Sequence, residues 1–196
     1  MKITFKSPLI LIFSFICLII LIFTEYLGVS KGLFTLGGTW GNGSFSSYFR
    51  LFSHTLGHAN MEHLIGNLSF ILLIGPIVEK QYGAKLLFIM MLTTAIVTSV
   101  LHILFFDHGL LGASGIVFML IILTSMVNIK NHEIPLSFIL VVIIFIGKEL
   151  LGSFADDNIS HFAHIIGGLV GGLFGFLLAD KKSSPASKGK DILTGL

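Results

Sequence analysis

Six predominantly apolar stretches of the chain carry no charged residue and are candidate membrane spans. A helix that crosses a membrane needs about 20 mostly apolar residues, with a range of about 17–25. The six stretches cover residues 7–24, 64–78, 86–106, 109–129, 134–147 and 158–179. We therefore predict an all-α, polytopic membrane protein, with six transmembrane helices in a single domain over residues 1–180.

Two of the stretches are short for a span. Stretch 64–78 can be extended upstream through uncharged His and Asn residues, and stretch 134–147 can continue past Lys148 and Glu149 because long side chains snorkel at helix ends. Stretch 7–24 is longer than the apolar core of a signal peptide, which has about 7–15 residues. We expect it to be a retained span.

Composition supports a membrane protein and narrows its partners. Hydrophobic residues make up 54% of the 196 residues and charged residues only 11%, whereas soluble domains carry about 25% charged residues. The net charge of +2 gives no reason to expect a nucleic-acid partner. The single cysteine, Cys17, lies in the first apolar stretch, where an inert packing role is expected. The bilayer is thus the expected environment.

The distribution of basic residues predicts the orientation. With the N-terminus in the cytoplasm, six spans return the C-terminus to the same side, and the basic tail 181–196 is expected to be disordered there. Nine lysines then lie inside and three basic residues outside, which agrees with the positive-inside rule. The inner set is Lys2, Lys6, Lys80, Lys85, Lys130, Lys181, Lys182, Lys188 and Lys190, and the outer set is Lys31, Arg50 and Lys148.

The connection between the first two spans, residues 25–60, is unusually long. Loops without secondary structure rarely exceed about 12–15 residues unless they are functional. Its second half, residues 45–52, is aromatic and apolar with one cation, so it is expected either to lie in the headgroup layer or to be a plain interfacial connector.

A serine flanked by glycines stands in the fourth stretch, in Gly112-Ala-Ser114-Gly115. Gly112 permits an unusual backbone and Gly115 removes bulk beside the serine. Unpaired N–H groups at a helix start are able to donate to an oxyanion. Small residues also let membrane helices approach closely, so this motif alone favours packing over catalysis.

His164 in the sixth stretch supplies the base that a serine nucleophile needs. Gly167, Gly171 and Gly175 follow at intervals of four and form a ridge near the face of His164. This ridge predicts close packing of the sixth helix on the fourth, beside Ser114. Taken singly, His164 is equally consistent with a structural polar contact between helices.

A third polar patch precedes the second stretch. His63 and Asn67 are four residues apart and share one helix face, from which both can donate hydrogen bonds toward negative charge. His54 and His58 are expected to brace the loop. Clustered histidines also suit zinc or haem, but no cysteine or well-placed carboxylate accompanies them, so we expect no metal.

Gly75, Glu79 and Gly83 repeat every four residues at the other end of the second span. The glycines suit close packing, and Glu79 is expected to hold a neighbouring loop by accepting N–H bonds. This ladder is predicted to be structural because it lies across the membrane from Ser114.

Together, and in this order, the motifs resemble those of the rhomboid intramembrane serine proteases over about residues 49–178. The resemblance implies a six-helix fold without a cofactor, with Ser114 as nucleophile and His164 as general base. It implies an oxyanion hole made of His63, Asn67 and the backbone N–H of Ser114. It also implies substrates that are transmembrane helices of other membrane proteins. The supporting residues are His58, Phe118, Gly112 and Gly115.

The chain departs from the family pattern at two places. Phe49-Arg50 stands where Trp-Arg is frequent, and Phe118 stands where a tyrosine commonly stacks on the catalytic histidine. Phe118 keeps the ring contact and lacks the hydroxyl. The chain resembles the minimal six-span form, expected in a bacterial inner membrane with both termini in the cytoplasm.

The expected mechanism has two further parts. Water is expected to reach Ser114 through a polar cavity lined by His58, His63, Asn67 and His164. The fifth span with the loop 152–158 is expected to form a mobile gate and cap. The alternative is a catalytically silent relative that binds membrane clients through the same fold.

Overall fold

The structure is a computed structural model that describes residues 6–37, 43–126, 136, 139–140, 143–144, 147 and 161–179. Throughout these residues the regular elements are helices, and no β-strand occurs among them. Four helices are long and apolar enough to cross a membrane. They are α1 (Pro8–Tyr26), α3 (Met61–Tyr82), α4 (Ala84–Phe105) and α7 (His161–Ala179). The predicted all-α class is confirmed.

The first, second, third and sixth predicted spans correspond to these helices with shifted ends. Helix α3 starts at Met61 because the Asn60 side chain accepts the His63 N–H at 2.9 Å and caps the first turn. It continues beyond the predicted end at residue 78, because the Glu79 side chain is buried and has hydrogen-bond partners there. The fifth span 134–147 lies mostly outside the described residues. The loop 152–158 and the tail 181–196 lie wholly outside them.

The predicted start of the fourth span at residue 109 is wrong. Helix α5 (Ser114–Met126) begins five residues later. Gly112 has a φ of +123°, which an α-helix cannot contain. The backbone before it bonds to other segments: Leu110 exchanges two 2.9 Å hydrogen bonds with Leu36, and the Gly112 N–H donates to His54 O at 2.9 Å. Ser114 is therefore the first residue of a helix.

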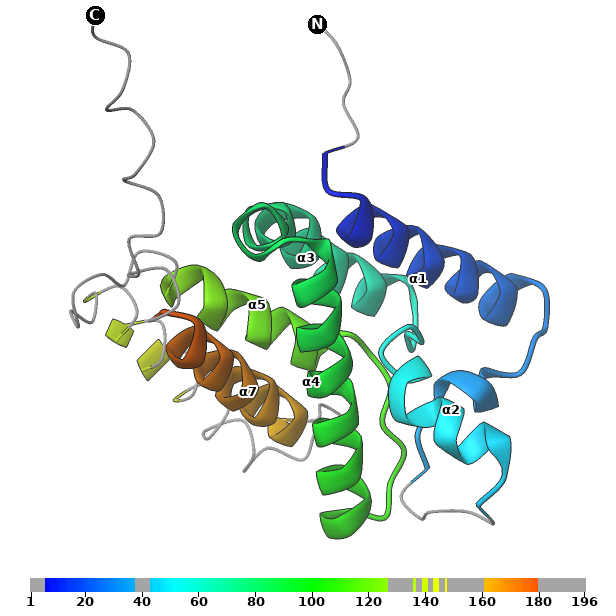
Figure 1. Cartoon of the computed structure of the whole chain (residues 1–196). Helices are drawn as coiled ribbons and strands as arrows, with labels where there is room; N and C mark the ends of the chain where they lie inside the picture. Colours follow the sequence, from blue (N-terminus) through cyan, green and yellow to red (C-terminus); the bar gives the residue numbers. More distant parts are fainter. Residues whose placement is uncertain are drawn as a thin grey trace, which may run out of the picture.

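Helix α4 occupies the middle of the bundle (Figure 1). It contacts α1, α3, α5 and α7, and also α2 (Phe45–Ser53). Of its most apolar window, 44% is buried, against 28% for each of the other three long helices. Helices α5 and α7 lie side by side, and α1 runs along α3. The buried core thus gathers around α4.

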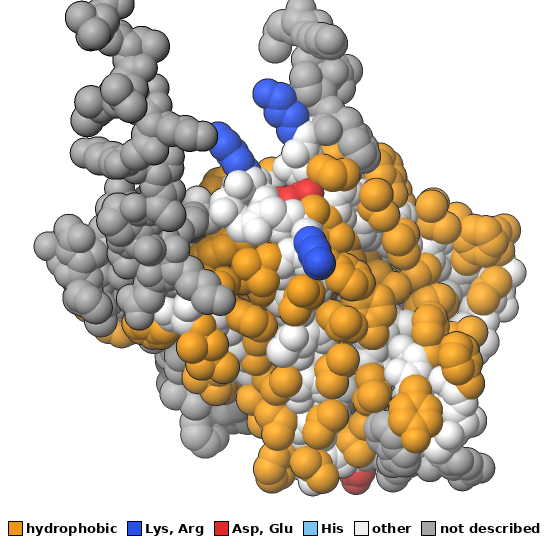
Figure 2. Space-filling view, in the orientation of Figure 1, with side chains coloured by type: hydrophobic (Ala, Val, Ile, Leu, Met, Phe, Trp, Pro, Cys, Tyr) orange, Lys and Arg blue, Asp and Glu red, His pale blue; other side chains and the backbone are white. Residues whose placement is uncertain are grey.

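The outer faces of the long helices are apolar, and orange side chains cover most of the visible described surface in Figure 2. Examples from three helices are Phe15, Leu73 and Leu173, which are 57%, 71% and 60% exposed. An aqueous protein rarely shows so large an apolar surface. Contact of these helix faces with the hydrocarbon core of a membrane explains their exposed apolar side chains.

Glu79 joins the end of α3 to the start of α1. Its two carboxylate oxygens accept the N–H groups of Leu9 and Ile10 at 3.1 and 3.0 Å. A Cβ added to Gly75, one turn earlier, would lie 2.6 Å from Cδ1 of Ile10. Gly75 therefore has the predicted packing role and Glu79 the predicted acceptor role, but Glu79 caps a helix rather than a loop. The packing role predicted for Gly83 is wrong, because a Cβ there would meet nothing within 4 Å; Gly83, with a φ of +81°, is instead the C-cap of α3.

The long connection between α1 and α3 contains regular structure of its own. The short 3₁₀ helix η1 (Lys31–Phe34) and helix α2 form within it. Helix α2 packs on α4 and on η1. Beyond η1, Leu36 packs with Leu110 and Ala163 in a small buried cluster. The connection therefore reaches the segments that precede both Ser114 and His164.

Candidate active site

Ser114 lies at the N-terminus of α5, where backbone N–H groups have no intrahelical partner. The first bond of this helix runs from the Val117 N–H to Ala113 O at 3.0 Å. Ala113 is fully buried, whereas Ser114 is half-buried. The hydroxyl and the free N–H groups of this turn therefore belong to one partly accessible helix start.

The predicted packing of α7 on α5 through its glycines is confirmed. Gly167 lies directly on the backbone of Gly115, and a Cβ added to Gly171 would come within 2.7 Å of Met119 O. A Cβ added to Gly175 would likewise lie too close to the Met126 side chain, 2.8 Å from its Cε. The two helices approach backbone to backbone along this ridge.

The ridge brings His164 to the first turns of α5. Phe118, one turn after Ser114, is stacked on the His164 ring with centroids 4.4 Å apart and planes 7° apart. Ala163 O lies 3.2 Å from the position of a Cβ on Gly115. Ser114 and His164 therefore lie on turns of two helices that are in contact through Gly115, Phe118 and Ala163.

His63 and Asn67 lie against the turn that precedes Ser114. A Cβ added to Gly112 would be 2.7 Å from Cε1 and 2.9 Å from Nε2 of His63, and 3.8 Å from Nδ2 of Asn67. Asn67 is 6% exposed, and its Nδ2 has no hydrogen-bond partner in the described part of the chain. A buried donor without a partner is unusual in a folded protein. It is available to a ligand.

The tautomer of neutral His63 follows from the hydrogen bond that its Nδ1 accepts. The Ala59 N–H donates to Nδ1 of His63 over 3.5 Å, so Nδ1 is an acceptor and the neutral ring carries its hydrogen on Nε2. Nε2 is one of the two ring atoms that face Gly112. A second N–H donor thus points toward the turn before Ser114. His63 is also close enough to His164 for an electrostatic interaction.

His54 and His58 brace the loop by hydrogen bonds, as predicted. Nδ1 of His54 bonds to Arg50 O at 3.1 Å, and Nδ1 of His58 bonds to Leu56 O at 3.3 Å. The His58 ring also lies edge-on to His63, with centroids 5.1 Å apart. Burial is the main cause that lowers the pKa of each ring to about 4. Both are neutral at pH 7.

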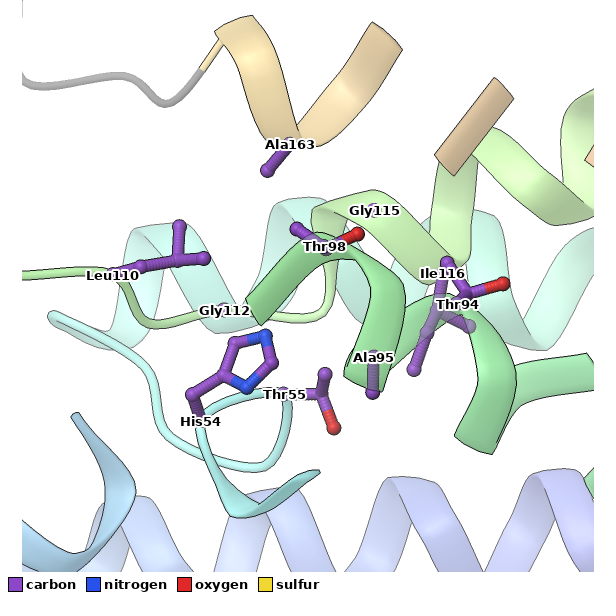
Figure 3. Close-up of a pocket in the computed structure, with 10 residues that line it drawn as sticks. All are labelled: His54, Thr55, Thr94, Ala95, Thr98, Leu110, Gly112, Gly115, Ile116 and Ala163. Carbon is purple, nitrogen blue, oxygen red and sulfur yellow. The ribbon is translucent and has the colours of Figure 1, made fainter. Parts of the chain in front are cut away.

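A small cavity lies beside the glycines that flank Ser114 (Figure 3). Its volume is about 10 Å³, close to the room that one water molecule needs. Its walls come from α4, α5, α7 and the segments before α3 and α5. They are His54, Thr55, Thr94, Ala95, Thr98, Leu110, Gly112, Gly115, Ile116 and Ala163. This cavity is distinct from the expected polar cavity lined by His58, His63, Asn67 and His164, which stays a prediction.

Thr94 and Thr98 are the site-adjacent residues that sequence reasoning missed. Both are buried, and Oγ1 of Thr98 has no partner within the described residues. The sequence pattern that indicates them is a polar residue at every fourth position of a mostly apolar span: Thr94, Thr98 and His102. Such spacing marks one face of a helix. Across the described ranges, no group of three or more His, Cys, Asp or Glu side chains is arranged to hold a metal ion.

Comparison with known proteins gives the same family as the motifs. The family model for the rhomboid domain matches residues 46–181 of this chain. The chain is 24% identical over 135 residues to Rhomboid protease GlpG of Haemophilus influenzae, a match that covers 67% of this chain and 70% of the relative. It is 31% identical over 140 residues to Putative rhomboid protease YdcA of Bacillus subtilis, which covers 69% of each.

A plant relative, Rhomboid-like protein 11, chloroplastic, of Arabidopsis thaliana, is 26% identical over 165 residues, or 76% of this chain. There the match spans only 58% of the relative's length. The family-model match at residues 46–181 includes the helices α3, α5 and α7, which carry His63, Asn67, Ser114 and His164. With four helices apolar enough to span a membrane, the chain is an integral membrane protein that belongs to the rhomboid family.

Proposed function

We propose that this protein is an intramembrane serine endopeptidase, with Ser114 as nucleophile and His164 as general base. The observation that carries the proposal is the glycine-mediated contact of α7 with α5, which sets His164 and its stacked partner Phe118 beside the turn of Ser114. Relatives named as rhomboid proteases add support.

In the proposed reaction, His164 accepts the Ser114 proton as the hydroxyl oxygen attacks a peptide carbonyl. The negative charge that develops on the carbonyl oxygen is stabilised by Nε2–H of His63, Nδ2–H of Asn67 and the backbone N–H of Ser114. His164 then protonates the leaving amine, and water hydrolyses the acyl-enzyme. Phe118 holds the imidazole plane by stacking, without a hydroxyl of its own.

The proposed substrates are transmembrane segments of other membrane proteins, cut near the non-cytoplasmic surface. A helix in lipid hides its carbonyls in hydrogen bonds, so segments with small or helix-breaking residues near that surface are favoured. The proposed orientation has both termini in the cytoplasm of a bacterial cell, and the excess of lysine on the side opposite the cut supports it.

The test is cleavage of a panel of model transmembrane substrates in liposomes. Ser114→Ala and His164→Ala should each lower turnover by about 1,000-fold or more and abolish labelling by a serine-directed phosphonate. Ser125→Ala is the matched control on the same helix, because its hydroxyl is bonded to Ile121 O at 2.9 Å. It should cleave at the wild-type rate.

Normal proteolysis by Ser114→Ala would overturn the assignment. A wild-type protein that binds transmembrane segments but is neither labelled nor active would instead be a client-binding rhomboid protein.

A further inference from the structure

We propose that Lys31 and Glu25 are positioning residues for His63, acting through the backbone of Ala59. This inference rests on the proposed role of His63 in the oxyanion hole. Neither residue belongs to a motif that identifies the family, and both lie outside the matched domain at 46–181. Three consecutive contacts connect them to the imidazole.

The first two contacts meet at the Lys31 ammonium group. It forms an ion pair with the Glu25 carboxylate at the end of α1 and donates to Ala59 O at 2.8 Å. Helix α1 is thereby connected to the segment that immediately precedes α3.

The third contact starts from the same residue, because the Ala59 N–H donates to Nδ1 of His63 at 3.5 Å. A bond of this length weakens or breaks with a small displacement of the donor. An amide N–H is only a donor, so this bond selects the tautomer with hydrogen on Nε2, the nitrogen beside Gly112. The C=O and N–H of Ala59 belong to adjacent peptide groups joined at its Cα. By holding the C=O, Lys31 therefore limits the movement of the Ala59 backbone and of the N–H donor.

The backbone of Lys31 is itself held in place, although its side chain is 38% exposed. The N-cap Ser30 accepts the Gly32 N–H at 3.1 Å and fixes the start of η1. At the other end of η1, Phe34 lies directly on the backbone of Gly57, and Leu33 O accepts the Ser53 hydroxyl. Only the lysine side chain has to be ordered to make the contact, which lowers its entropic cost.

The test is a double-mutant cycle of Lys31→Met with His63→Ala, measured as kcat and KM on a model transmembrane substrate. Solvent-exposed ion pairs and single hydrogen bonds contribute little, so Lys31→Met should lower kcat about threefold to tenfold and leave KM unchanged. In the His63→Ala background, Lys31→Met should cause no further loss. Lys31→Arg should restore kcat because it keeps the charge and a donor.

Two single variants refine the measurement. Glu25→Gln removes the ion pair and keeps Lys31, so its loss of kcat should be smaller than that of Lys31→Met. Lys85→Met is the matched control, because Lys85 is an exposed lysine at the start of α4, on the Glu79 side of the molecule. It should retain the wild-type kcat. Equal losses from Lys31→Met in both His63 backgrounds, or a wild-type kcat for Lys31→Met, would contradict the proposal.

A second measurement does not depend on proteolysis. Nuclear magnetic resonance of ring-labelled histidine reports which nitrogen of His63 carries hydrogen, and the Gly112 signals report the position of the adjacent ring. Lys31→Met should change both, and Lys31→Arg should change neither. If wild-type protein shows no cleavage that depends on Ser114, the proposed function fails while this readout still decides the inference. Unchanged signals in Lys31→Met would overturn it.

Discussion

At Gly112, the backbone and the surroundings each exclude a side chain. Its φ of +123° is one that L-residues with a Cβ rarely adopt. A Cβ would also lie 2.7 Å from the His63 ring, closer than van der Waals contact permits. His63 therefore approaches the turn before Ser114 only because this position is glycine, whereas Nδ2 of Asn67, at 3.8 Å, would be in ordinary contact with a Cβ.

Gly112→Ala should consequently displace the His63 ring and strain the turn, at a cost of about 1–3 kcal/mol for the backbone alone. We expect kcat to fall about 100-fold or more, as for loss of an oxyanion-hole donor. The matched control is Gly66→Ala in α3, where a Cβ meets nothing within 4 Å. Cleavage assays on the pair decide the matter, and equal rates for the two variants would show that the space beside His63 is unimportant.

Some residues near the candidate site could be predicted from the sequence and others could not. His63 and Asn67 were found because their spacing places them on one helix face, and His164 because a polar group in an apolar span needs a reason. Thr98 was overlooked because a threonine in a membrane helix commonly bonds its own backbone. In contrast, Oγ1 of Thr98 has no partner among the described residues.

The contact of α5 with α7 depends on the glycine at every fourth position of α7, namely Gly167, Gly171 and Gly175. Gly171 and Gly172 are adjacent in α7, yet they have different surroundings. A Cβ on Gly171 would lie 2.7 Å from Met119 O, whereas one on Gly172 would lie 3.9 Å from a methyl group of Ile122. Backbone cannot move aside as a flexible side chain can, so the two positions should respond differently to the same methyl group.

Gly171→Ala should reduce the free energy of unfolding by about 1–3 kcal/mol, the usual cost of overpacking, and should lower kcat by separating His164 from Ser114. Gly172→Ala should be neutral or slightly stabilising, since alanine favours the helix. Thermal unfolding in detergent micelles and cleavage rates measure both effects. Equal destabilisation by the two variants would contradict this account of the ridge.

The helices were easier to predict than the segments between them. Charge-free length located α1, α3, α4 and α7 because lipid requires long apolar helices. It misplaced the start of α5, because residues 109–113 are apolar and yet bond to Leu36 and His54 instead of to one another. Such backbone pairing leaves no pattern in the side chains.

At the scale of the whole molecule, Glu79 connects two spans far from the candidate site. It lies sixteen residues after His63 in α3, or about 24 Å along the helix. Its buried carboxylate supplies the acceptors for the first N–H groups of α1. Stability and catalysis should therefore respond separately to changes at this position.

Glu79→Gln keeps one acceptor and loses the charge and the second oxygen. We expect the free energy of unfolding to fall by about 1–3 kcal/mol, with kcat within about twofold of wild type at temperatures where the protein stays folded. The control is Asp107→Asn, an exposed acid in the connection after α4. Unfolding in detergent tests the first expectation and cleavage the second. A large loss of kcat without loss of stability would show that Glu79 acts on the site.

The backbone bonds that hold residues 110–112 have a consequence for biogenesis. Their partners, Leu36 and His54, lie far upstream, and the cluster around Leu110 is completed by Ala163, near the end of the described chain. Contacts between distant segments form late, because loop closure must precede them. Until α7 is inserted, this turn lacks its contact with Ala163, and Ser114 lacks its proposed base His164. Under the proposed mechanism a nascent rhomboid would therefore be unable to cut neighbouring proteins until its last helix has been inserted.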